Sequence, residues 1–474
     1  MFTYNFKYEL KLLLRSSWIQ LLTLLLLLLF VFASYNGKQK VDKRTADITS
    51  AQTVVDTSDK ETLSILLAIE KGEDLNLSPW VTPTSPINIG NQNPRVAAMP
   101  ANEMAFMSVG QSDIYTHYVL PKVSGDDFAL NLSEMASPIQ LLFGSFDLAF
   151  VVVYLLPLIV IAFSYNVLSE ERERGSLKLL ASQPISIRKW VFQKIGIRMF
   201  WISIMVLLAT TVAFLLNDIK SFDGYVLFFV TCVIYMLFWF GLTFAVNIQI
   251  GKSTQNAFVL LGFWIVFVLL IPSIINQVSD VLYPVPSRNQ LINEMREHKS
   301  EAEKKQDQIL DNFLRDHPEY AVNNDANSKS FWHSYMASQK IVKEELQPLL
   351  SEFDNNLAKR QKWVNKLQWL SPAILVQQDL NTRAGTSKAD YENYRQQILN
   401  FSNEWRDYFM PLLYNNQVFT SEHFSKLPIF QYKSDKSIIN GYRLWGVLLL
   451  TSIVLVIVII TYKLRTKKEY SIIQ

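Results

Sequence analysis

The sequence predicts an α-helical polytopic membrane protein with six transmembrane helices and two extracytoplasmic domains, one of mixed α+β structure and one a helical hairpin or bundle. Three observations lead to this fold class. Half of the 474 residues are apolar, and Phe, Trp and Tyr alone make up 13% of the chain. The apolar residues collect in runs close to the ~20 residues that cross ~30 Å of hydrocarbon. Basic residues gather beside these runs, and two of the intervening segments are long.

Six apolar runs fit a membrane span. The predicted spans are residues 17–35, 147–167, 198–216, 225–246, 257–275 and 445–462. The first run could also be the core of a signal peptide, because Lys7, Lys11 and Arg15 precede LLTLLLLLLF. It is longer than a usual signal core, however, and SYNGKQK is a poor small-residue cleavage site, so we expect a retained helix.

The basic residues beside the spans predict the orientation. Lys and Arg are concentrated before the first span, in the loop of residues 168–197 and in the tail of residues 463–474. Such short basic segments stay in the cytoplasm. The loop NDIKSFDG carries one Lys and two Asp, as an outer loop does. We therefore expect both termini inside, and the segments 36–146 and 276–441 outside.

The first outer segment, residues 36–146, mixes several local patterns. A helical start near residues 62–71 precedes the Pro, Asn and Gly-rich stretch SPWVTPTSPINIGNQNPR and short alternating runs such as SDIYTHYVL. Alternation indicates strands, and the Pro, Asn and Gly cluster indicates turns. The segment is predicted to be a compact α+β domain.

The second outer segment, residues 276–441, has apolar residues at a helical period. One stripe recurs at spacings of three, four and seven, and consists of Tyr335, Val342, Leu346, Leu349, Phe353, Leu357, Val364 and Leu367. A weaker stripe consists of Leu291, Met295, Ile309, Phe313 and Leu314. The turn HPEYAVNNDANS separates them, which predicts an antiparallel pair of helices ~40 Å long, with a third helix near residues 391–413. The stripes either pack on each other or form a partner surface.

Composition disfavours several functional classes. The net charge of +3 reflects the membrane flanks, so no nucleic-acid partner is expected. The single cysteine, Cys232, lies in a predicted span, and with five histidines in all no disulfide, zinc site or iron–sulfur site is expected. The spans lack charged residues away from their ends, with Asp147 at the outer mouth of the second. Ion-coupled transporters and intramembrane metalloproteases need such groups at depth.

The segment IGKST, residues 250–254, resembles the end of a phosphate-binding loop. That loop needs a glycine five residues before its second glycine, and Val246 occupies this position. We therefore expect no nucleotide site and interpret the segment as a short cytoplasmic turn.

The loop LSEERERGSLKLLASQPISIRKWVFQK carries the candidate functional residues. They are Glu170, Glu171, Arg172, Glu173, Gly175, Ser176, Leu177, Leu179, Leu180 and Pro184. The acidic residues favour the positive N-terminal end of a short helix, the leucines supply an apolar patch, and the proline ends the helix. Such a helix suits either a groove on a cytoplasmic protein or a layer of lipid headgroups, and the pattern alone does not choose between them.

Three blocks carry a resemblance to a known family. SYNVLSEERERGSLKLLASQPISIRKWVFQKI resembles the first cytoplasmic loop of ABC-type-2 transporter permeases, where an acidic run, Gly-Ser or Gly-Thr, a Leu pair and a Pro-Ile step form a coupling helix. FGSFDLAFVVVYLLPLIVIAFSYN, which precedes it, is similar to the same family. Residues 370–401, LSPAILVQQDLNTRAGTSKADYENYRQQILNF, resemble the helical extracytoplasmic domain, of uncharacterised function, in one bacterial branch.

This resemblance implies the permease subunit of an ATP-driven ABC transporter in the bacterial inner membrane. Its partners would be a second permease, alike or different, and a separate ABC ATPase that holds ATP and Mg²⁺, so this chain is expected to be non-catalytic and without a cofactor of its own. Residues 170–180 would dock on the ATPase, and residues 1–16 would form an amphipathic interfacial helix. An exporter is the main expectation. The alternatives are an ATPase-driven assembly device that acts on a periplasmic protein without transport, and a membrane scaffold or receptor.

Overall fold

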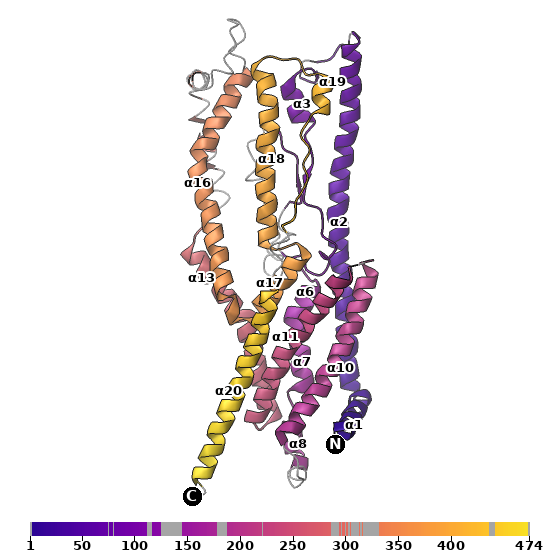
Figure 1. Ribbon diagram of the computed structural model, residues 1–474, viewed down its shortest axis with the longest axis vertical. Coiled ribbons are helices and arrows are strands. Elements are labelled where there is room, and N and C mark those ends of the chain that lie inside the picture. Colours follow the sequence, from indigo (N-terminus) through magenta and orange to yellow (C-terminus); the bar gives the residue numbers. More distant parts are fainter. Residues whose placement is uncertain are drawn as a thin grey trace.

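The molecule is elongated and mostly helical, with a bundle of apolar helices at one end and a polar head at the other (Figure 1). The computed structural model describes residues 2–285, 331–435 and 441–472, apart from residues 74, 79, 111–115, 125–144, 178–186 and 220, together with a few positions between 293 and 315. Both termini lie at the end of the bundle that is farthest from the head (Figure 1). This end is called the loop end below.

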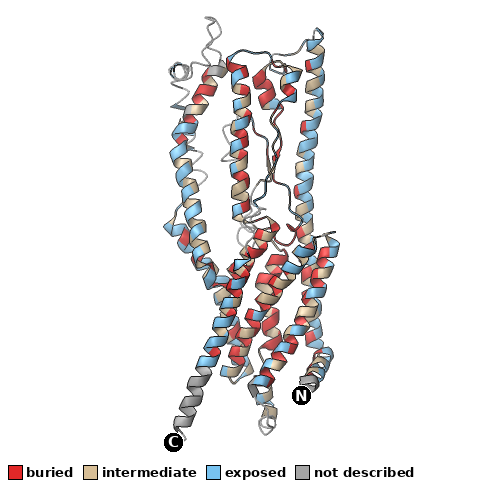
Figure 2. Cartoon of the chain, in the orientation of Figure 1, coloured by how far each residue is buried: buried red, intermediate tan, exposed pale blue. Residues whose placement is uncertain are grey.

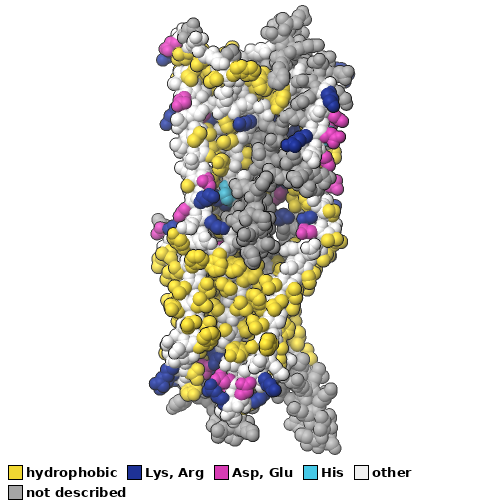
Figure 3. Space-filling view, turned by 180° about the vertical axis from the view of Figure 1, so that it is seen from behind, with side chains coloured by type: hydrophobic (Ala, Val, Ile, Leu, Met, Phe, Trp, Pro, Cys, Tyr) yellow, Lys and Arg dark blue, Asp and Glu magenta, His cyan; other side chains and the backbone are white. Residues whose placement is uncertain are grey.

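Six helices among the described residues are long and apolar enough to cross a membrane. They are Ser17–Glu70, Leu148–Glu173, Lys189–Leu216, Phe222–Gln249, Ser253–Leu282 and Tyr442–Ile460. Each predicted span falls within one of them, apart from a residue or two at the ends. On the face seen in Figure 3, apolar side chains form a belt across this part of the molecule, with charged side chains above and below it. The prediction of a mostly helical chain with six helices able to cross a membrane is confirmed, and the protein is a multi-pass membrane protein.

The bundle consists of helices and of two π-helical turns. Its elements are α1 (Phe2–Arg15), α2 (Ser17–Glu70), α6 (Leu148–Phe150), η2 (Val151–Leu155), α7 (Leu156–Ser164), α8 (Ser169–Glu173), α10 (Ile187–Leu216), α11 (Phe222–Gln249), α12 (Ser253–Trp264), η3 (Ile265–Leu270), α13 (Ile271–Leu282) and α20 (Tyr442–Ile472). Helix α10 packs between α2 and α11, and α11 also contacts α7 and α20. The centre of the bundle is buried, as Figure 2 shows, and Tyr235, Phe238 and Trp239 are among its largest enclosed side chains.

The two π-helical turns lie just before prolines. Proline lacks an amide N–H and its ring displaces the carbonyl four residues earlier, which widens the helix. Pro157 follows η2, and the carbonyl of Val153 accepts a hydrogen bond of 3.0 Å from the hydroxyl of Tyr235. Pro272 follows η3, whose Phe267 carbonyl accepts a hydrogen bond of 2.5 Å from the Ser371 hydroxyl. Side chains from neighbouring elements therefore satisfy carbonyls in the widened turns.

The head combines both long intervening segments. Its elements are the distal half of α2, α3 (Pro86–Gln92), β1 (Ala97–Ala98), β2 (Tyr118–Val119), α16 (Phe331–Leu367), the short 3₁₀ turn η5 (Gln368–Leu370), α17 (Pro372–Ala384), α18 (Lys388–Tyr414) and α19 (Ser421–Ser425). The antiparallel strands β1 and β2 pair Ala97 with Val119 and Ala98 with Tyr118. Helices α16 and α18 include the predicted helices near residues 335–367 and 391–413. All five residues of the weaker stripe and the predicted turn HPEYAVNNDANS lie outside the described residues, so the predicted pair of helices is not tested.

One hydrophobic core unites the two segments of the head. Trp405 in α18 is fully buried and donates a hydrogen bond of 3.1 Å from its indole N–H to the carbonyl of Gly90. The hydroxyl of Tyr394 donates to the carbonyl of Ala97 at 2.8 Å. The prediction of two separate outer domains, residues 36–146 and 276–441, is therefore not confirmed. Short turns and two-residue strands bury too little apolar surface to stand alone, so they pack on α18 instead.

Helix α2 is one continuous helix of 54 residues, which differs from the prediction of a span ending at residue 35. At Gly37 the returning chain crosses the helix so closely that a Cβ atom would lie 2.1 Å from the carbonyl oxygen of Phe106. Farther along, the buried guanidinium of Arg44 donates hydrogen bonds of 3.1 and 2.5 Å to the carbonyl of Met99. These contacts stabilise the helix beyond its apolar span, where apolar residues on its inner face are sparse.

Helix α17 seats the head on the bundle. Leu375, Val376 and Leu380 belong to the core of the bundle, although α17 lies outside the six spans. The buried carboxylate of Asp379 accepts hydrogen bonds from Arg383 at 2.7 Å and from Thr231 of α11 at 3.3 Å. A movement of the spans at this point would therefore be transmitted to the head through α17.

Candidate functional site

The predicted loop begins at α8, at the loop end of the second span (Figure 1). The chain leaves α7 through a turn at residues 165–168, forms the five-residue helix α8, and turns again at Arg174 and Gly175. Three predicted site residues, Leu179, Leu180 and Pro184, lie outside the described residues. The other seven, from Glu170 to Leu177, can be placed.

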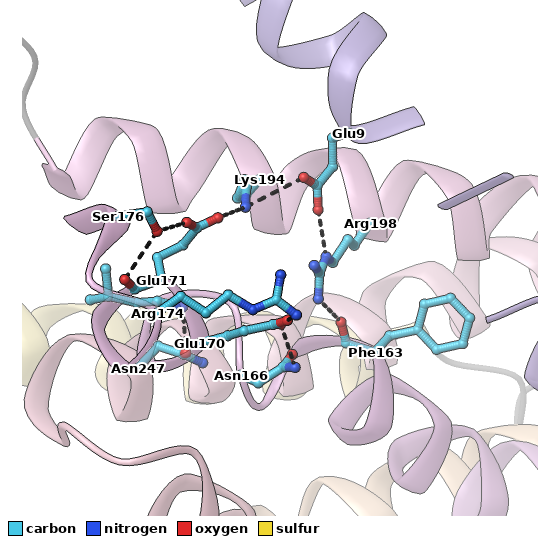
Figure 4. Close-up of polar contacts among 11 residues, drawn as sticks. Glu9, Phe163, Asn166, Glu170, Glu171, Arg174, Ser176, Lys194, Arg198 and Asn247 are labelled. Carbon is cyan, nitrogen blue, oxygen red and sulfur yellow. Dashed lines mark hydrogen bonds and ion pairs between the residues drawn. The ribbon is translucent and has the colours of Figure 1, made fainter. Parts of the chain in front are cut away.

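Glu171 faces the third span. Its carboxylate lies 2.9 Å from the ammonium of Lys194 in α10. The hydroxyl of Ser176 donates a hydrogen bond to the same carboxylate and another, of 3.1 Å, to the Glu171 carbonyl. Figure 4 shows Glu171 between Ser176 and Lys194. These bonds fold the residues after the Gly175 turn back onto α8.

Lys194 extends this network to the N-terminal helix. Its ammonium lies 4.4 Å from the ring centre of Trp190 and 3.5 Å from the carboxylate of Glu9 in α1. The same carboxylate pairs with Arg198 at 2.9 Å, and Arg198 also donates to the carbonyl of Phe163 (Figure 4). Glu9, Lys194 and Arg198 are all buried. The two acids and two bases balance, as buried charges must in order to offset their desolvation.

The opposite side of α8 contacts the turn between the fourth and fifth spans. The carboxylate of Glu173 accepts hydrogen bonds from the amide of Ser253 at 2.8 Å and from its hydroxyl at 3.0 Å. The Ser253 hydroxyl also donates to Ser169 at 2.9 Å. A guanidinium nitrogen of Arg172 lies 2.7 Å from the point that a Cβ on Gly251 would occupy. The segment IGKST thus forms a turn that packs against α8.

Two buried asparagines support the turn that leads into α8. Asn247 accepts a hydrogen bond from the amide of Leu168 at 3.2 Å and donates one to the carbonyl of Ser164 at 2.9 Å. Asn256 donates to the carbonyl of Tyr165, also at 2.9 Å. Backbone groups that lose their helical partners are costly when buried, so these amides hold the turn in one conformation.

The exposed tip of α8 is charged. Among the described residues from Ser169 to Leu177, the exposed ones are Arg172, Glu173, Arg174 and Gly175. Arg174 pairs with Glu170 at 2.5 Å, and Gly175 has a φ of +76°, a backbone conformation that favours glycine. Leu177 packs partly against the core of the bundle. The structure therefore joins Glu170, Glu171, Glu173 and Ser176 in hydrogen bonds within the protein and leaves the tip exposed.

Sequence reasoning missed the partners of the loop. Lys194 appeared only as one of several basic flank residues, although Lys194 and Arg198 are four apart and lie on one helix face. Glu9 is the single acid in an otherwise basic N-terminal helix, and this exception was a usable signal. The amphipathic helix of residues 1–16 packs on α2 and α10 with Glu9 and Leu13 buried. Its inner face is therefore partly polar, not the purely apolar face expected of an anchor.

Helix α17 was also missed as a separate element. Its limits do have local signals, because Ser371 caps the N-terminus with Pro372 in the first turn, and Gly385 ends the helix with a φ of +67°. Ser387 and Asp390 form a capping box at the start of α18. The block of residues 370–401 therefore encodes the junction between the bundle and the head.

Comparisons with known proteins give one finding of similarity. Residues 288–433 match a family model described as a domain of unknown function (DUF3526). No curated protein matches the chain at a significant level. Among the described residues, no group of three or more His, Cys, Asp or Glu side chains is placed to hold a metal ion. The described part of the matched region includes α16, α17, α18 and α19 of the head.

Proposed function

We propose that this chain is the membrane-spanning permease subunit of an ATP-driven ABC exporter in a bacterial inner membrane. The loop of residues 168–197 couples it to a separate ATPase, with the exposed tip of α8 in the docking surface. In this proposal the loop end and both termini face the cytoplasm, and the head is extracytoplasmic. The basic residues at the loop end support that orientation.

The position of α8 is the observation that carries the proposal. Its side chains bond to α10 and α1 on one side, through Lys194 and Glu9, and to the turn before α12 on the other, through Ser253. A push on the exposed tip would therefore reach the second, third and fifth spans and the N-terminal helix together. A loop that only lay on lipid headgroups would not need bonds on both sides.

The spans and the turn at residues 250–254 fit a subunit that receives work from another protein. Glu9, Glu171, Lys194 and Arg198 form a charge-balanced network near the loop end, and the carboxylate of Glu173 accepts a hydrogen bond from Ser253. We assign ATP and Mg²⁺ to the partner ATPase for this reason. A second permease, identical or different, would complete the assembly.

A second candidate function is a mechanical device that acts on a periplasmic protein. It is favoured by the continuous helix α2, which joins the bundle to the far end of the head in 54 residues, and by the seat that α17 forms on α11. The same ATPase would then move the head, and no substrate would cross the membrane.

Co-purification tests the coupling assignment. The double variant Gly175→Val/Leu177→Glu changes the tip of the loop, and we expect the chain to lose its associated ABC ATPase. A matched control is Gly72→Val/Leu63→Glu, because Gly72 also has a positive φ of +87° and Leu63, like Leu177, packs partly against a hydrophobic core, but both lie at the head end of α2. The control is expected to keep the ATPase, and the chain alone is expected to hydrolyse no ATP.

Two outcomes would count against the proposal. Retention of the ATPase by the loop variant would refute the docking site. Absence of any ATPase from the wild-type preparation would favour a scaffold or receptor. Vesicles that contain only the permease and its ATPase separate the exporter from the mechanical device, because only the exporter moves a substrate without a periplasmic partner.

A further inference from the structure

A cavity lies where the bundle meets the head. It has a volume of about 510 Å³ and is lined by residues of α13, α16, α17, the start of α18 and the start of α20. Helices α13, α17 and α20 converge at this level in Figure 1. Val153, Tyr154 and Val268 of the two π-helical turns supply apolar lining from the membrane side. Widened helical turns of this kind recur at functional sites.

The opposite lining is polar and carries an excess of positive charge. Asp280 pairs with Arg360 at 2.7 Å, and neither Lys388 nor Arg443 forms an ion pair with another described lining residue. Arg443 donates a hydrogen bond of 2.9 Å to Thr382, but its Nε atom is buried and has no hydrogen-bond partner. A buried donor without a partner is costly, and a bound acceptor would remove that cost.

Lys388 is a second cation in the cavity lining whose charge is destabilised by its surroundings. Burial and the nearby charge of Arg360 lower the pKa of its ammonium, and the opposing charges of Glu392 and Asp280 do not cancel this effect. Lys388 is the first residue of α18, and the carboxylate of Asp390 already caps that end of the helix. The lysine and the unsatisfied guanidinium of Arg443 both line the cavity, and both favour an anion there.

We propose that this cavity binds an anionic amphiphile, whose phosphate or carboxylate contacts Lys388 and Arg443 and whose apolar part lies against Val153, Tyr154 and Val268. The polar lining comes from the head and from the ends of α13 and α20 nearest the head, and the two π-helical turns of the spans supply apolar lining. The ligand therefore enters from the apolar belt with its charged group at the membrane surface. An anionic phospholipid has this chemistry, and so does an amphiphilic substrate. The inference is independent of the proposed coupling to an ATPase.

Native mass spectrometry of the full chain in detergent tests this site. The probes are phosphatidylglycerol, phosphatidylcholine with the same acyl chains, and glycerol 3-phosphate, each added at equal concentration. We expect phosphatidylglycerol to bind at least tenfold more tightly than the other two. Lys388→Gln is expected to weaken this binding about tenfold. This is the loss of affinity expected when one hydrogen bond to a charged group is removed. Lys388 makes no described hydrogen bond, so its replacement should leave the fold intact, which a thermal melt checks.

Two further variants make the test specific. Lys366→Gln removes an exposed lysine at the end of α16, outside the cavity lining, and should leave binding unchanged. Ala389→Trp adds bulk to an exposed lining residue without changing charge, and should block binding. Equal binding of both lipids, or an equal loss in Lys366→Gln and Lys388→Gln, would overturn the proposed anion site. If glycerol 3-phosphate bound as tightly as phosphatidylglycerol, the cavity would be a site for soluble anions. The proposal of an amphiphilic ligand would then be overturned.

Discussion

The carboxylate of Glu9 and the guanidinium of Arg198 form an ion pair of 2.9 Å between side chains that are 1% and 7% exposed and 189 residues apart in the sequence. The pair ties the N-terminal helix α1 to the third span. Glu9 also lies 3.5 Å from Lys194, which in turn binds Glu171 of the predicted coupling loop. The N-terminal helix is therefore part of the support of the loop, and this relationship can be tested.

Glu9→Gln should destabilise the bundle strongly. The substitution keeps the size of the side chain but leaves an uncompensated positive charge among buried groups, at a cost of about 3–5 kcal/mol. Unfolding in mixed micelles with increasing denaturing detergent measures the effect. Lys11→Gln is the control, because Lys11 is exposed on the same helix and its loss should change stability by less than about 0.5 kcal/mol.

A double-mutant cycle shows whether the pair itself is responsible. In Glu9→Gln/Arg198→Gln both charges are gone, so the double variant should be less destabilised than the sum of the two single variants. Strict additivity would mean that Glu9 and Arg198 contribute independently, and the buried pair would not explain the cost.

The six spans could be predicted from the sequence because crossing hydrocarbon requires long apolar runs, a constraint that acts within each segment. The length of α2 could not be predicted in this way. Apolar residues are sparse in its distal half, which is stabilised in part by contacts with residues 97–110, such as Arg44 with the carbonyl of Met99. The contact between the two outer segments could not be predicted either, because it depends on long-range bonds. The hydrogen bond between Trp405 and Gly90, for example, joins residues 315 positions apart.

The candidate site could also be predicted only in part. The acidic run, the glycine turn and the proline could be located from local composition, but the direction of each acidic side chain depends on distant partners. Glu171 binds Lys194, and Glu173 binds Ser253, 80 residues away. Periodicity describes one helix at a time, so it does not reveal which helices meet around α8.

The orientation of the chain can be measured with single cysteines. Cys232, the only cysteine, is buried within a span and is replaced by alanine to give an unreactive background. In intact cells, Gln92→Cys in the head should react with a membrane-impermeant maleimide, and Arg174→Cys at the loop tip should react only after permeabilisation. Both positions are exposed, so access to reagent decides the result. The opposite labelling pattern would reverse the proposed topology.

Trp405 tests whether the head is one folding unit. Trp405→Ala removes a fully buried ring and its bond to Gly90, and should destabilise the head by about 3–5 kcal/mol. Hydrogen exchange should then speed up in both α3 and α18, although these helices come from different segments of the chain. Trp80→Ala is the control, since that ring is 73% exposed. Faster exchange in α18 alone would mean that the two segments fold separately.

A contact between the distal end of α2 and the start of α19 has a testable pH dependence. The amide of Ser421 donates a hydrogen bond of 2.7 Å to the carboxylate of Glu70, and the Ser421 hydroxyl donates another of 2.8 Å. These two bonds, the amide bond foremost, hold the pKa of Glu70 below its ordinary value of 4.5. A lowered carboxyl pKa adds stability above the unfolded-state value, and this stability is lost as the pH falls through the folded-state value.

Amide exchange at Ser421 reports this bond directly. At neutral pH, Glu70→Ala should exchange faster than the wild type at Ser421. The ratio of the two rates should stay constant down to the ordinary carboxyl pKa of 4.5 and then fall toward one as Glu70 in the wild type takes up its proton. Comparing the two proteins at each pH cancels the intrinsic pH dependence of exchange. Glu61→Ala, an exposed acid on the same helix, should give a ratio near one throughout. A Glu70→Ala ratio that stayed constant to about pH 3, well below the ordinary range of carboxyl groups, would show that the bond does not depend on the charge of Glu70.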